Sequence, residues 1–172
     1  RFLNSLWLFV VGTVITWCLS FPVGISAAIR RGSVFDRSTT FLSYVLISVP
    51  GFFFAYILFL FVVKTFDIPV IGMQTFGMSK ADTIHQIMDR VWHLVLPSIL
   101  GALGGIALLS RYVRAQMLEV IHQDYIRTAW SKGLSENVVI FRHALKNGII
   151  PVVTIGGVLV AYSIGGAVLT ET

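Results

Sequence analysis

The 172-residue sequence contains few charged residues: aspartate, glutamate, lysine and arginine together make up 12% of it. A soluble domain usually contains about 25%, so these residues could not cover a water-exposed surface. Hydrophobic residues make up 56%, which places the chain in the membrane class. The net charge is +5, but no DNA- or RNA-binding motif accompanies it. We therefore expect no nucleic-acid partner.

Cysteine is nearly absent as well, since Cys18 is the one cysteine of the sequence and lies in an apolar run. A single cysteine cannot form an intrachain disulfide, and without neighbouring ligands it indicates neither zinc binding nor redox chemistry. The phosphate-binding pattern G-x-x-x-x-G-K-[ST] is also missing, so we expect no ATP site in this chain. The sequence begins without methionine, and we expect it to be an excerpt of a longer protein.

Long apolar runs dominate what the sequence does contain. About 20 residues of helix cross the roughly 30 Å of hydrocarbon in a bilayer, and backbone polar groups must be hydrogen-bonded there. We predict an all-α polytopic membrane protein with about four transmembrane helices in a single domain, 1–172. The predicted spans are 2–29, 38–63, 92–117 (with an uncharged centre at 94–110) and 148–170.

The segments between these spans differ in charge. The first, 30–37, has three arginines against one aspartate; the second, 64–93, is balanced; the third, 111–147, has six basic residues against three acidic ones. Because basic residues concentrate in cytoplasmic loops, we expect 30–37 and 111–147 to be cytoplasmic and 64–93 to lie outside. Both ends of the sequence would then face outward.

The outer loop, 64–91, contains a helix signal. Ser79-Lys-Ala-Asp82 fits a capping box with the shorter acid, and apolar residues follow at helical spacing. We predict a short surface helix over 80–91. It could lie in the headgroup plane, or it could form a docking surface for a partner outside the cytoplasm.

Proline and glycine punctuate the spans. Proline removes a helical hydrogen bond and kinks or breaks a helix, so Pro22, Pro50 and Pro97 are expected to interrupt their helices. Closely spaced small residues allow helices to approach, or they could leave room for a solute. No ionisable residue lies inside the uncharged runs, which counts against a proton- or sodium-coupled carrier. The candidate residues for a translocation path are Pro50, Gly51, Gly104, Gly157 and Gly165.

The segment 118–147 is the most informative part of the chain. Residues 119–132 have helical character, with Ile121, Tyr125 and Ala129 predicted on one face, and Gly133 supplies the geometry that ends a helix. Ser135 is a suitable N-cap for a second helix. We expect that helix to break at residues 147–148 and the last span to begin at Pro151. The result is a cytoplasmic helix–turn–helix elbow whose apolar face needs a covering membrane or protein.

These residues resemble the permease subunit of bacterial binding-protein-dependent ABC importers, and more narrowly the dipeptide/oligopeptide/nickel branch. The most specific matches are DYIRTAWSKGL at 124–134 and FRHALKNGIIPVVT at 141–154. Further matches in chain order are RFLNSL at 1–6, AAIRRGS at 27–33 with Asp36 and Arg37, Val49-Pro50, HLVLP at 93–97 and VLTET at 168–172. Members of the family have about six spans.

The resemblance departs from the wider importer family in two places. The Leu-Pro expected downstream of the loop is Leu145-Lys146 here, with the proline delayed to Pro151; the other departure lies in the loop itself. The wider importer family carries a Glu-Ala-Ala…Gly motif in this loop, whereas the present chain has Arg127-Thr128-Ala129 and then Gly133. A base thus replaces the acid, a form that the peptide branch commonly shows. The departure puts in doubt any ion pair that the glutamate makes elsewhere.

The resemblance implies a non-enzymatic subunit of the bacterial inner membrane that forms a path for peptides, nickel or related small solutes. It implies several partners: ABC ATPase subunits that hold ATP and magnesium, a second and related permease subunit, an extracytoplasmic solute-binding protein and membrane lipid. No cofactor is expected in this chain. The first short helix of the elbow would be the coupling helix, and the residues implied for ATPase coupling are Asp124, Tyr125, Arg127, Thr128, Ala129, Lys132, Gly133 and Leu134.

Other functions remain open at the level of sequence. The permease could carry another solute, because function resides in sites rather than in folds. A channel or secondary carrier would show flux without ATP. A membrane-embedded enzyme would need a nucleophile or metal cluster at membrane depth, and His93, His122 and His143 lack ligand spacing.

Overall fold

The chain folds into helices throughout the part that the computed structural model describes, residues 2–66 and 83–171. No strand occurs in these two ranges, which confirms the predicted all-α class. The elements, in chain order, are α1 (Phe2–Ile29), α2 (Val34–Ser48), α3 (Gly51–Phe66), α4 (Thr83–Ile121), α5 (Asp124–Ser131), the π-helix η2 (Val138–Ala144) and α6 (Leu145–Glu171).

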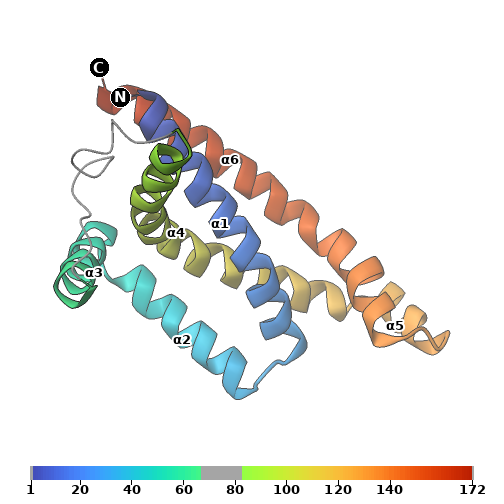
Figure 1. Ribbon diagram of the computed structural model, residues 1–172. Coiled ribbons are helices and arrows are strands. Elements are labelled where there is room, and N and C mark those ends of the chain that lie inside the picture. The colour runs from blue at the N-terminus through green and yellow to red at the C-terminus, as the bar shows by residue number, and fades with distance from the viewer. Residues whose placement is uncertain (1, 67–82, 172) are drawn as a thin grey trace.

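Helices α1 and α4 form the centre of the bundle and run in the same direction (Figure 1). The hydroxyl of Thr16 donates to the carbonyl oxygen of Ala102, and one turn later Ser20 donates to that of Ile106. A constant sequence offset between partners requires parallel helices. The contact is close, because a Cβ atom at Gly24 would lie 2.6 Å from the carbonyl oxygen of Ser110.

Three helices of the described ranges are long and apolar enough to cross a membrane: Trp7–Ile29, Thr83–Ile121 and Val138–Val158. The apolar run 38–63 instead forms two helices, α2 and α3, bent by 104°. The bend lies at Val49, whose backbone is extended (φ −90°, ψ 129°), as expected for a residue before proline. If this broken pair is one span, the described chain has four.

Two predicted interruptions are wrong. Pro22 lies inside α1 and Pro97 inside α4, and both helices continue through them. The hydrogen bond from Ser20 to α4 and the close approach at Gly24 hold α1 in place on both sides of Pro22, and neighbouring helices can compensate for a lost backbone bond.

The predicted separate surface helix over 80–91 is also wrong, because residues 83–91 are the first turns of the continuous helix α4. The apolar residues that suggested it, including Ile84 and Met88, are exposed on these turns. The capping residues 79–82 and most of the outer loop lie outside the described residues.

The elbow differs from the prediction at both ends. Glu119 belongs to the last turn of α4, since that helix ends at Ile121, and α5 begins separately at Asp124. The expected break at residues 147–148 does not occur, because η2 continues directly into α6 and Pro151 lies within α6. Gly148 instead allows close packing: a Cβ atom there would lie 3.4 Å from Met117 Sδ and 3.7 Å from the carbonyl oxygen of Gln116.

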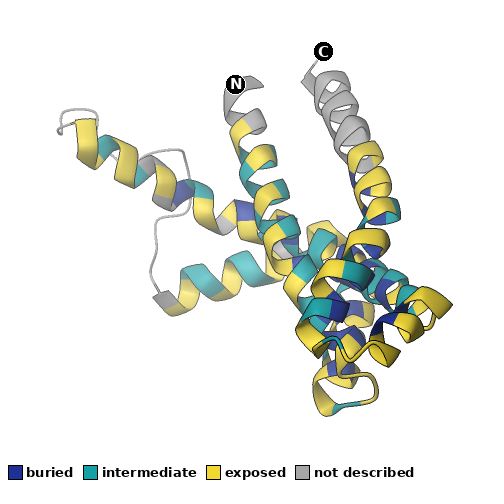
Figure 2. Cartoon of the chain, turned by 90° about the vertical axis from the view of Figure 1, so that its right-hand side faces the viewer, coloured by how far each residue is buried: buried dark blue, intermediate teal, exposed yellow. Residues whose placement is uncertain are grey.

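The hydrophobic core lies where α1, α4, α5, η2 and α6 meet, at the end of the bundle opposite the start of α1 and the end of α6 (Figures 1 and 2). Away from this end, the helices are mostly exposed. The buried residues of the core are Ile25, Ala28, Leu109, Val113, Met117, Ile126, Ala129, Val139, Ile140, Ala144 and Val152.

Candidate functional site

The helix α5 is a short, separate element held between two sharp turns. Before it, the backbone turns at Gln123 (φ −73°, ψ 150°), whose carbonyl oxygen accepts from the N–H groups of Ile126 and Arg127. After it, Gly133 adopts the left-handed conformation (φ 72°) and its N–H donates to the carbonyl oxygen of Trp130. Glycine adopts this conformation without the cost that a Cβ atom adds.

One face of α5 is anchored in the core. Ile126 is 0% exposed and Ala129 is 5% exposed, and both belong to the cluster that includes Val113 and Met117 of α4. Tyr125 was predicted on the same face as Ala129, but Tyr125 is exposed whereas Ala129 is buried. The reason is that α5 starts afresh after the turn at residues 122–123, so the periodicity of α4 does not extend into it.

The other face of α5 is exposed and mixes aromatic, charged and hydroxyl groups. Tyr125 and Trp130 are 42% and 44% exposed. Arg127 and Asp124 form a 3.7 Å ion pair whose side chains are 78% and 98% exposed, and a pair so exposed contributes little to stability. The Thr128 hydroxyl donates to the backbone of its own helix.

The residues implied for ATPase coupling thus fall into an exposed group and a buried or partly buried group. Asp124, Tyr125, Arg127, Thr128, Lys132 and Gly133 are exposed together at the elbow, whereas Ala129 is buried and Leu134 packs partly against the core. Trp130 and Phe141 are exposed aromatic residues of the same elbow that the implied set left out. The sequence feature that could have identified these two residues is a large aromatic side chain within a polar segment.

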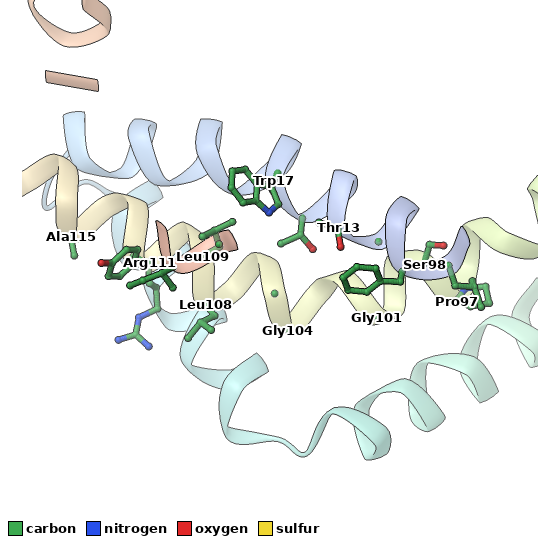
Figure 3. A pocket seen from close by; sticks show the side chains of 18 residues that line it. Thr13, Trp17, Pro97, Ser98, Gly101, Gly104, Leu108, Leu109, Arg111 and Ala115 are labelled. Carbon is green, nitrogen blue, oxygen red and sulfur yellow. The ribbon is translucent and has the colours of Figure 1, made fainter. Parts of the chain in front are cut away.

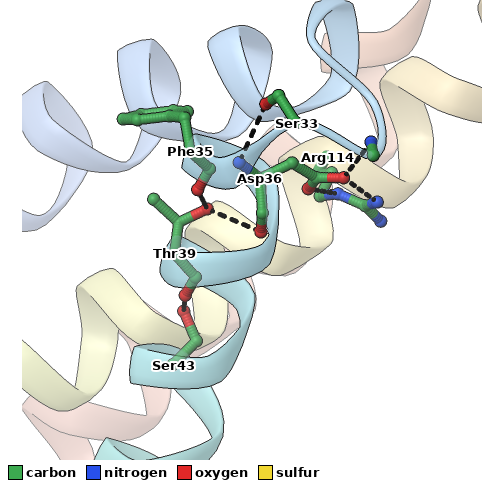
Figure 4. Close-up of polar contacts among 7 residues, drawn as sticks. Ser33, Phe35, Asp36, Thr39, Ser43 and Arg114 are labelled. Carbon is green, nitrogen blue, oxygen red and sulfur yellow. Dashed lines mark hydrogen bonds and ion pairs between the residues drawn. The ribbon is translucent and has the colours of Figure 1, made fainter.

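A second polar site, which the sequence did not reveal, joins α2 to α4 (Figure 4). Asp36 is 3% exposed. Its carboxylate accepts from Arg114 Nε at 2.5 Å and Nη2 at 2.9 Å, and from the N–H of Gly32 at 2.9 Å. The Asp36 N–H donates to the hydroxyl of Ser33, so the residues around the carboxylate also form a reciprocal helix cap.

One turn earlier on α4, Arg111 makes a second link to α2. Its Nη2 atom donates to the hydroxyl of Tyr44 at 3.1 Å, and its guanidinium carbon lies 4.0 Å from the centre of the Tyr44 ring. Sequence reasoning used these arginines only to orient the chain, because partners 67 and 78 residues apart leave no local pattern.

A cavity of about 860 Å³ lies along α1, α4 and α6 (Figure 3). Of the residues predicted for a translocation path, Gly104 lines it. Pro50 and Gly51 lie instead at the α2–α3 bend, and Gly157 faces open space. The surroundings of Gly165 lie outside the described residues. Gly105 and Gly156 allow close packing, the former against Thr16 and the latter against Trp17.

Chemistry at a metal ion has no candidate within the described parts of the chain, since no group of three or more histidine, cysteine, aspartate or glutamate side chains there could hold one. His93 forms a contact within its own helix, with Nδ1 2.8 Å from the carbonyl oxygen of Asp89.

Sequence comparison gives relatives for the whole chain. It is 39% identical to the oligopeptide transport system permease protein AppB of Bacillus subtilis over 99% of its length. It is 33% identical over its full length to the dipeptide transport system permease protein DppB of Escherichia coli K12. A third relative is the di/tripeptide transport system permease protein DppB of Pseudomonas aeruginosa, 39% identical over 87% of this chain.

The chain spans about half the length of these curated relatives, namely 53%, 56% and 48%. Residues 20–172 match the family model described as binding-protein-dependent transport system inner membrane component. The match includes the core, the elbow and the links between α2 and α4. The chain therefore belongs to the family of inner membrane components of binding-protein-dependent transport systems.

Proposed function

We propose that this chain is a transmembrane subunit, or part of one, of an ATP-driven importer that takes up peptides. The three relatives described above are named as permeases for oligopeptides, dipeptides and di/tripeptides. The chain itself would be non-catalytic: ATP and magnesium would bind to a separate cytoplasmic ATPase subunit, and this chain would carry no cofactor.

The geometry of α5 carries the proposal. The helix is fixed in the core by Ile126 and Ala129 and exposes Tyr125 and Trp130 on its other side. An exposed aromatic surface with charged edges is typical of a protein interface. Because α5 packs on η2, which contacts α4 and continues into α6, a partner that moves α5 would also move those membrane helices. We infer that this partner is the ATPase.

Further partners follow from the same proposal. The end of the bundle that holds both the α1–α2 turn and the elbow would be cytoplasmic. Segment 64–93 would lie outside, where a solute-binding protein would deliver the peptide. A second, related permease subunit would complete the path, with lipid around both. Gly104, which lines the cavity, is the predicted path residue that this arrangement favours.

A substitution at the elbow tests the proposal. Gly133→Asp strains a left-handed position (φ 72°) and adds negative charge beside α5, so we expect the ATPase to dissociate. Peptide uptake should fall at least about tenfold, which corresponds to roughly 1.4 kcal/mol of lost coupling. The measurements are uptake by cells and co-purification of the ATPase with the permease.

Ser38→Asp is the matched control, because Ser38 is exposed on α2 near the same end of the bundle and the substitution adds the same charge away from α5. Immunoblots of membranes should show equal amounts of both variants. Normal uptake and normal ATPase binding by Gly133→Asp would contradict the proposal, and peptide flux without ATP would favour a channel or secondary carrier.

A further inference from the structure

Two arginines on one side of α4 both reach α2. Arg114 binds the carboxylate of Asp36 through two nitrogen atoms, and Arg111 binds the hydroxyl and covers the ring of Tyr44. Asp36 lies in the first turn of α2 and Tyr44 lies two turns later. We call these four residues the polar clamp. It attaches α2 to α4 at two levels.

The Asp36 end of the stronger half of the polar clamp is buried, and the Arg114 end is partly exposed. The side chain of Asp36 is 5% exposed and that of Arg114 is 27% exposed. A carboxylate in such a place needs its partner, because removing one member of a buried pair leaves an uncompensated charge. Two parallel bonds between a guanidinium and a carboxylate also fix distance and orientation.

The same stretch of α4 also belongs to the core that holds the elbow. Val113 and Met117 lie in the same buried cluster as Ile126 and Ala129 of α5, and η2 packs against both α5 and α4, while Arg111 and Arg114 reach α2. One segment of α4, residues 111–117, therefore connects the elbow on one side with α2 on the other. Helix α2 in turn leads into α3 through the 104° bend.

We propose that the polar clamp transmits movement of the elbow to the bent α2–α3 pair during transport. When the ATPase displaces α5, the packed segment of α4 moves with it, and the clamp makes α2 follow as one body. Asp36 and Arg114 are thus positioning residues of the transport cycle. This inference rests on the proposed function and adds the route by which motion reaches helices that do not contact α5.

A purely stabilising role explains the arrangement less well. Hydrophobic residues of similar volume often stabilise a protein as well as a buried ion pair does, or better. What the pair adds is a fixed geometry between two helices, and transmission of a displacement requires such a fixed geometry.

The test uses the complete transporter in liposomes, with both permease subunits, the ATPases and the solute-binding protein. Uptake of a radiolabelled dipeptide and ATP hydrolysis are measured in the same preparation. For Arg114→Gln and Asp36→Asn, we expect uptake per ATP hydrolysed to fall by roughly 5- to 150-fold, the usual range of coupling between sites. The ATPase should remain bound in both variants.

Arg37→Gln is the matched control. Arg37 is exposed on α2 next to Asp36, so the substitution removes the same charge at the same end of the bundle without touching the polar clamp. Uptake per ATP should equal that of the parent. The exchanged pair Asp36→Arg with Arg114→Asp should recover part of the loss, which a defect of either single residue would not predict.

Parent-like uptake per ATP in Arg114→Gln and Asp36→Asn would overturn the inference. Loss of the bound ATPase from these variants would also overturn it, because the polar clamp would then be needed for binding of the ATPase rather than for transmission of movement. If both variants fail to accumulate, the double variant Asp36→Cys with Arg114→Cys is made in a Cys18→Ser background. Uptake per ATP should be higher with the two thiols cross-linked than with them reduced. Equal uptake per ATP in the two states would overturn the inference. A separate experiment tests the proposed function itself: normal ATPase binding by the Gly133→Asp variant would contradict that function, whatever the clamp variants show.

Discussion

At the residue scale, glycines that lie in similar apolar helices have different roles in packing. A Cβ atom at Gly24 would meet the carbonyl oxygen of Ser110 at 2.6 Å and Val113 Cβ at 2.7 Å, whereas one at Gly101 would meet nothing within 4 Å. Spacing alone does not separate the two cases, because both glycines lie in apolar helices. The partner helix decides which of them must remain glycine.

Gly24→Ala should therefore separate α1 from α4. The new methyl group would contact a backbone oxygen that cannot move away as a side chain can, and overpacking of this kind costs about 1–3 kcal/mol. We expect a lower melting temperature of the purified protein in detergent, followed by intrinsic fluorescence or by loss of soluble protein on heating.

Gly101→Ala is the comparison for this measurement. Alanine is the better helix former by about 1 kcal/mol and the position is open, so the melting temperature should stay the same or rise. Equal melting temperatures for Gly24→Ala and the parent would show that α1 and α4 are packed less closely than the structure indicates.

At the scale of the elements, the sequence identified the helical class, the turn at Gly133 and the segment that forms the elbow. It did not identify the start of α5, because a helical pattern that continues through residues 119–132 does not show that the chain turns at Gln123. It also took Gly148 for a helix break, although this glycine allows α6 to approach α4. The Asp36–Arg114 pair could not be predicted, since it depends on how distant helices pack.

The two faces of α5 differ enough to be distinguished by chemical labelling. In a Cys18→Ser background, Thr128→Cys lies on the exposed face and Ala129→Cys on the buried one. We expect a maleimide reagent to label Thr128→Cys rapidly and Ala129→Cys at least about tenfold more slowly, because a buried thiol reacts only when the helix opens locally.

Addition of the ATPase should then protect Thr128→Cys. Arg31→Cys, exposed in the turn between α1 and α2, serves as the control position that the ATPase should leave unprotected. Labelling of Thr128→Cys that is unchanged by saturating ATPase would show that the partner binds elsewhere, even though the helix is exposed.

At the scale of the whole molecule, the arrangement of the helices relates distant loops to one another. Parallel packing of α1 with α4 places the α1–α2 turn and the elbow at the same end of the bundle, and the start of α4 lies toward the other end (Figure 1). The exposed basic residues Arg30, Arg31 and Lys132 lie at the end with the elbow. Since basic residues concentrate in cytoplasmic loops, the charge of this end supports the proposal that it faces the cytoplasm.

Single cysteines at the two ends test that orientation directly. Ser38→Cys and Ser131→Cys lie at the end with the elbow, and Thr83→Cys lies at the start of α4; all three positions are exposed. In a Cys18→Ser background, we expect a membrane-impermeant maleimide to label Thr83→Cys in intact spheroplasts. The other two should be labelled only in inside-out vesicles, because the membrane separates them from the reagent in whole cells. The unsubstituted background reports nonspecific labelling. Labelling of Ser131→Cys in intact spheroplasts would reverse the orientation, and the elbow could then not meet a cytoplasmic ATPase.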